Sequence, residues 1–126
     1  MHVLWADATG EMELSGTPLD LLTLVEELRL GRGSCRLDAS ANPAPYSKAL
    51  SSIETKQTSG SITISISSDH ETLEIQGGAE ALELLASTVE EFAAENDCTS
   101  HLHVEYLPGH EFLSHNSKPL VVALAE

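Results

Sequence analysis

The feature that most constrains the fold of this chain is a segment that occurs once in each half. The first copy reads "MELSGTPLDLLTLVEEL" and the second reads "LEIQGGAEALELLASTVEEF". The matched positions are Gly16 with Gly77, Leu21 with Leu82, and Leu24 with Leu85. After an insertion of about one helical turn, "VEEL" in the first copy matches "VEEF" in the second. Because the matches are few, a coincidence of helix and strand patterning is the alternative to a true repeat.

Each copy contains one predicted helix. The first helix follows Thr17, which suits the N-cap, and begins at Pro18, which suits the first helical position. It is expected to end at Gly31. The second helix follows Gly77 and Gly78 and runs to about Glu95. The expected inward residues are Leu21, Leu22, Val25 and Leu28 in the first helix, and Leu82, Leu85, Ala86, Val89 and Phe92 in the second.

Strand patterns occupy the remaining sequence. They are "HVLWA", "EMELS", "SITISIS", "TLEIQ", "HLHVEY" and "PLVVALA". The first two are expected to form a hairpin around Thr9 and Gly10. Each helix is preceded by a hairpin and followed by two strands around a Pro-bearing turn, "NPAPY" or "LPGHEF".

These elements predict two ββαββ units joined near Gly60. The pseudo-repeats span about 1–60 and 61–126, within a single domain of residues 1–126. The expected fold class is α+β: a two-layer fold in which two helices cover one face of a mostly antiparallel sheet.

Charge is the strongest signal in the composition. The chain has 20 acidic and 6 basic residues and a net charge of −14. Residues 1–60 hold eight acids and five bases, a net charge of −3, whereas residues 61–126 hold twelve acids and one base, a net charge of −11. Such a surface repels nucleic acid and anionic lipid and attracts a basic protein. The alternative is that the acids serve solubility alone.

The sequence also indicates a compartment. The first residues, "MHVLWADATG", lack the pattern of a signal peptide, and no apolar run approaches the length of a membrane span. Cys35 and Cys98 match no zinc or redox spacing. We therefore expect a cytoplasmic protein with two reduced thiols.

A histidine-rich stretch, "HLHVEYLPGHEFLSH", raises the question of a metal site. His101, His103 and His110 are the candidate ligands, with Glu105 on the same strand face as the first two. However, "HLHVEY" already has an apolar face, so these histidines occupy the polar face where polar residues are expected in any case. The interpretation favoured here is the edge of a hairpin without metal.

Catalytic motifs are absent from the sequence. There is no nucleophile elbow, no Gly-rich phosphate loop and no paired-cysteine motif. Arg29, Arg32 and Arg36 form a small basic cluster whose simplest role is to cap the first helix. We predict no catalytic residue and no cofactor.

Three segments resemble the immunity protein 32 family of bacterial polymorphic toxin systems. They are "PAPYSKALSSI", "LEIQGGAEALELLASTVEEFA" and "HLHVEYLPGHEFLSHNSKPLVV", and the most specific parts are "EYLPGH" and "SKPLVV". The resemblance implies a non-enzymatic protein that neutralises a cognate toxin by binding it inside the producing cell. The acidic surface suits a basic toxin such as a nuclease.

If the partner is basic, the toxin-facing surface is expected in the acidic second half. The candidate residues are Glu80, Glu83, Glu90, Glu91, Glu95, Asp97, Glu105 and Glu111. The alternative for these residues is an ordinary solvated helix face. Two other functions remain open at this point. One is a small metal-dependent enzyme that uses the histidine strand, and the other is a ligand-binding or assembly module whose sheet edge pairs with another chain.

Overall fold

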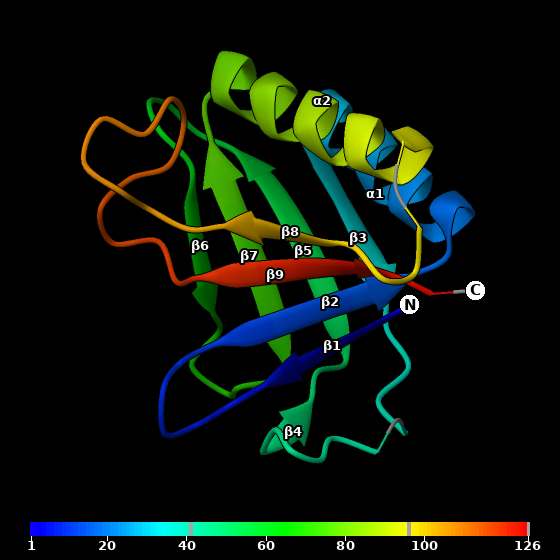
Figure 1. Cartoon of the computed structure of the whole chain (residues 1–126). Helices are drawn as coiled ribbons and strands as arrows, with labels where there is room; N and C mark the ends of the chain where they lie inside the picture. Colours follow the sequence, from blue (N-terminus) through cyan, green and yellow to red (C-terminus); the bar gives the residue numbers. More distant parts are fainter. Residues whose placement is uncertain (41, 96, 126) are drawn as a thin grey trace.

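The strands of the protein form two sheets that meet beneath a pair of helices (Figure 1). The structure is a computed structural model that describes residues 1–40, 42–95 and 97–125. In chain order the elements are β1 (His2–Trp5), β2 (Met12–Gly16), α1 (Pro18–Leu30), β3 (Arg32–Arg36), β4 (Lys48–Ala49), β5 (Ser52–Gln57), β6 (Thr63–Ile66), β7 (Thr72–Gly77), α2 (Ala79–Glu95), β8 (His101–Val104) and β9 (Leu120–Leu124).

Both helices lie where the sequence predicts them, and α1 shows the local reasons. The Thr17 hydroxyl accepts a hydrogen bond from the Asp20 N–H (3.1 Å), and the Asp20 carboxylate accepts one from the Thr17 N–H (3.0 Å). This capping box satisfies two backbone donors at the helix start. The helix ends at Gly31, whose φ of 73° is the left-handed conformation that favours glycine. Within α1, Leu24 is buried, whereas Leu22, expected inside, is 38% exposed.

The α+β class is confirmed, but the strands make two sheets and not the single sheet that was expected. Sheet A has the order β4-β1-β2-β9-β8, and sheet B has the order β3-β5-β7-β6. Each sheet is mixed: antiparallel pairs flank one parallel pair, β2 with β9 in sheet A and β5 with β7 in sheet B. The chain leaves one sheet before each helix and enters the other sheet after it. Each sheet therefore combines strands from both halves.

The pairing of the strands before each helix repeats with the same register. Val3 lies opposite Leu14 in β1–β2, and Ile64 lies opposite Ile75 in β6–β7, so both partners are shifted by 61 positions. The strands after the helices also form antiparallel pairs, in which Cys35 lies opposite Ile53 and Val104 lies opposite Leu120. The order β1-β2-β9-β8 in sheet A thus corresponds to β6-β7-β5-β3 in sheet B.

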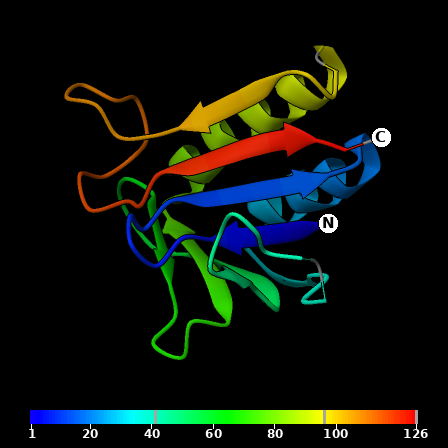
Figure 2. The same cartoon turned by 60° about the horizontal axis from the view of Figure 1, so that its bottom comes forward.

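One continuous apolar core joins these parts. The cluster contains residues of both helices and both sheets, and aliphatic side chains dominate it. Its fully buried members include Met12, Leu14, Ile53, Ile75 and Leu85. The helices lie side by side (Figure 1), and a second view shows them behind sheet A (Figure 2). No helix in the described part of the chain is long and apolar enough to cross a membrane.

Candidate functional site

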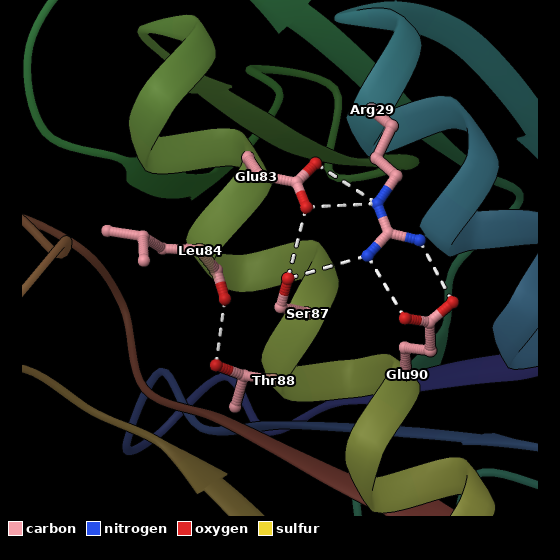
Figure 3. Close-up of polar contacts among 6 residues, drawn as sticks. All are labelled: Arg29, Glu83, Leu84, Ser87, Thr88 and Glu90. Carbon is pink, nitrogen blue, oxygen red and sulfur yellow. Dashed lines mark hydrogen bonds and ion pairs between the residues drawn. The ribbon is translucent and has the colours of Figure 1, made fainter.

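The acidic residues proposed as a partner surface fall into several distinct places. Two of them, Glu83 and Glu90, lie on the side of α2 that faces α1 (Figure 3). The Arg29 side chain of α1 reaches between them. Its Nε lies 3.0 Å from Glu83 Oε2, its Nη1 lies 2.9 Å from Glu90 Oε2, and its Nη2 lies 3.1 Å from Glu90 Oε1. The guanidinium therefore binds two carboxylates at once.

This ion-pair cluster changes the role expected of both glutamates. Their side chains are about half exposed, at 52% and 46%, yet each is paired within the protein. Hydrogen bonds from Arg29 lower the pKa of both carboxyl groups below their ordinary value of 4.5. Arg29 itself does more than cap the first helix, because it links the two helices. The sequence could not reveal this contact, since nothing in it states which helix faces pack together.

A groove opens at the start of α2, between that helix and the chain segments before β6 and after β8. Its volume is about 500 Å³. Its lining includes the apolar side chains of Ala81, Leu84 and Phe112, which are buried or partly buried. It also includes the exposed side chains of Glu80 and Glu111, which are called its rim residues here. Both glutamates are exposed and have no ion-pair partner among the described residues. The groove thus combines apolar surface with two unpaired carboxylates, which suits a ligand that has an apolar stem and a positive end.

Three further candidates lie at the other end of α2 and just beyond it. Glu91 and Glu95 are exposed on the last turns of the helix. Asp97 is exposed as well, but its Oδ1 accepts hydrogen bonds from the Thr99 hydroxyl (2.6 Å) and the Thr99 N–H (2.9 Å). These bonds lower the pKa of Asp97 and shape the turn that leads into β8.

Glu105 belongs to a different surface. It follows β8 and lines, together with Glu11 and His103, a smaller groove of about 290 Å³ beside β2, β8 and β9 of sheet A. The eight acidic candidates therefore do not form one patch. The structure brings Glu80 together with Glu111, brings Glu83 together with Glu90, and leaves Glu105 on the side of sheet A.

The candidate metal ligands also occupy separate environments. His101 and His103 are exposed on β8, on the face opposite the buried Val104. His110 lies in the next connection, where its Nδ1 accepts hydrogen bonds from the Phe112 and Leu113 N–H groups, both at 3.1 Å. That nitrogen is therefore engaged in holding a turn. Residues 1–40, 42–95 and 97–125 contain no group of three or more His, Cys, Asp or Glu side chains placed to hold a metal ion.

Comparisons with known proteins agree with the resemblance found in the sequence. The family model described as Immunity protein 32 matches residues 72–125, from the start of β7 to just past β9. That range contains both rim residues of the groove at the start of α2. No curated protein and no solved structure matches the chain. Residues 72–125 are therefore similar to the immunity protein 32 family, as the sequence resemblance predicted.

Proposed function

We propose that this protein is an immunity protein that binds a cognate toxin inside the producing bacterial cell and blocks its action. The family match over residues 72–125 is the observation that carries the proposal. An immunity function of this kind requires a tight complex and no chemistry. The protein then acts as a non-enzymatic inhibitor with no cofactor, and its partner belongs to a polymorphic toxin system.

We further propose that the toxin is a basic protein, such as a nuclease. The part of the chain that matches the family lies within the half that carries a net charge of −11. Glu80, Glu91, Glu95, Glu105 and Glu111 are exposed there, and none has an ion-pair partner within the described ranges. A toxin that binds phosphate presents positive charge, and complementary charge speeds the encounter of two proteins.

The test begins with the gene next to the one that encodes this chain. If that gene encodes a large secreted protein with a C-terminal toxin domain, the toxin domain is expressed in bacteria with and without this protein. We expect growth to be restored and a stoichiometric complex to elute as one peak in size-exclusion chromatography. The association rate should also fall steeply as salt rises. A toxin that arrests growth equally in both cultures would overturn the proposal.

A further inference from the structure

The two helices start in matched positions of the repeat, yet their surroundings differ. At α1 the capping box closes the helix start, and the amino group of Met1 lies 3.4 Å from the Asp20 carboxylate. The Met1 side chain also packs at Gly16, because a Cβ added there would meet Met1 Cγ at 3.3 Å. Both members of the capping box at this end of α1 thus have partners within the protein.

The corresponding end of α2 lacks these partners. Under the shift of 61 positions, Gly78 replaces Thr17 and Ala81 replaces Asp20, so both members of the capping box are missing. The Gly78 N–H donates to Gly60 O (2.9 Å), and a Cβ on Gly78 would lie 3.1 Å from Gly60 N. Glycine at this position therefore allows the preceding turn to lie close against the helix start. The groove of about 500 Å³ opens beside this contact.

The charge and the apolar surface of the groove indicate which kind of side chain it can bind. The start of a helix carries roughly half a positive charge, which alone would favour an anion. Glu80 and Glu111 oppose it with two full negative charges at the rim. The net field therefore favours a cation, while Ala81, Leu84 and Phe112 offer apolar surface to an aliphatic stem. Arginine and lysine have both parts.

We propose that this groove is the docking pocket for an arginine or lysine side chain of the toxin, with the aliphatic stem over Leu84 and Phe112 and the charged end between Glu80 and Glu111. This inference rests on the proposed function and names the part of the surface that performs it. Buried anchors of this type carry most of the binding energy in protein interfaces. Substitutions of the groove residues should therefore weaken the complex far more than equal changes of charge elsewhere on the surface.

The first test compares two double variants with the same charge. E80K/E111K alters the groove rim, whereas E91K/E95K alters exposed glutamates at the other end of α2. Each changes the net charge from −14 to −10, so long-range attraction to the toxin falls about equally. Using the full chain and the toxin domain in calorimetry, we expect E80K/E111K to raise Kd by about 100-fold or more and E91K/E95K to raise it by less than about tenfold.

The second test fills the groove without changing charge. Ser61 is exposed and lines the groove, and Ser59 is exposed in the same turn but outside it. Ser61→Trp should abolish toxin binding at concentrations where Ser59→Trp binds like the parent, and both should melt like the parent. If the parent binds the toxin and the groove variants bind it as tightly as their controls do, the groove is not the docking pocket, and the proposed immunity function still stands. A parent that fails to bind the toxin overturns both.

Discussion

Arg29 is the residue whose contacts most change the interpretation of the acidic surface. It holds Glu83 and Glu90 on the neighbouring helix, so these two carboxylates contribute to helix packing as well as to charge (Figure 3). Reversing both to lysine would place three positive side chains together at the helix junction. A loss of toxin binding in such a variant would therefore mix a folding effect with a contact effect. Glu80 and Glu111, which have no such partner in the described structure, are better probes.

Replacing Arg29 with alanine should lower stability in a manner that depends on pH. The pKa values of Glu83 and Glu90 are lowered in the folded protein from their ordinary value of 4.5. The pairing of these carboxylates with Arg29 therefore stabilises the folded protein at pH values above 4.5, and this stabilisation is lost as the pH falls below 4.5. We expect Arg29→Ala to melt below the parent at pH 7 and to melt at nearly the same temperature at about pH 3. Circular dichroism melting curves at the two pH values measure this difference.

Arg32→Ala is the matched control for this prediction, because it removes one positive charge from an exposed side chain without an ion-pair partner among the described residues. It should leave the melting temperature at pH 7 almost unchanged. The link between the helices would be shown to be unimportant if both variants melted alike at pH 7.

At the scale of single elements, the matched helix positions form the same part of the core. Leu21 and Leu82 are 0% and 1% exposed. Truncating either to alanine should reduce the free energy of unfolding by about 2–5 kcal/mol, because each leaves a cavity in a continuous core. Leu19→Ala is the control, since Leu19 is 75% exposed. Urea unfolding measures the three variants, and a loss confined to one of the two buried positions would contradict their equivalence.

The exposed histidines of β8 lead to a prediction about metal. His101 and His103 lie on the outer side of a strand whose Val104 is buried, and the aliphatic core is large enough to support folding without metal. We expect the melting temperature of protein purified without a histidine tag to be the same with and without a strong chelator. A drop of several degrees on adding the chelator would reveal a structural metal.

Local signals explain how far the sequence predicted these elements. Thr17, Pro18 and Gly31 fix the ends of α1 through contacts within a few residues, so its bounds were predicted. The two sheets were not predicted, because β9 pairs with β2 from more than a hundred residues away, and only tertiary packing decides that pairing. The groove was missed for a similar reason, since Glu80 and Glu111 come together only through the fold. The loss of the capping residues at Gly78 was the sequence signal that could have indicated it.

At the scale of the whole molecule, we propose that the chain arose by duplication of a ββαββ unit and that it is one cooperative domain. The equal strand orders of the two halves and the equal register of β1–β2 and β6–β7 support a duplication. The way in which the halves share both sheets supports a single domain. Sheet A contains β1, β2 and β4 from the first half and β8 and β9 from the second. Sheet B contains β3 and β5 from the first half and β6 and β7 from the second. Neither half can complete a sheet alone.

The fragments 1–60 and 61–126 should therefore be unfolded separately and should fold together when mixed. Fragment 61–126 alone would hold two unconnected strand pairs and one helix, and an isolated two-stranded hairpin is marginally stable at best in water. Fragment 1–60 alone would hold the pair β3-β5, one helix and β1-β2 extended only by the two residues of β4. The parallel pairs β2–β9 and β5–β7 join the halves in both sheets, so mixing restores the central pairing of each. We expect circular dichroism to show a cooperative melting transition for the equimolar mixture and none for either dilute fragment. A cooperative transition of fragment 61–126 alone, unchanged on dilution, would show that the second half is a domain by itself and would contradict the single-domain proposal.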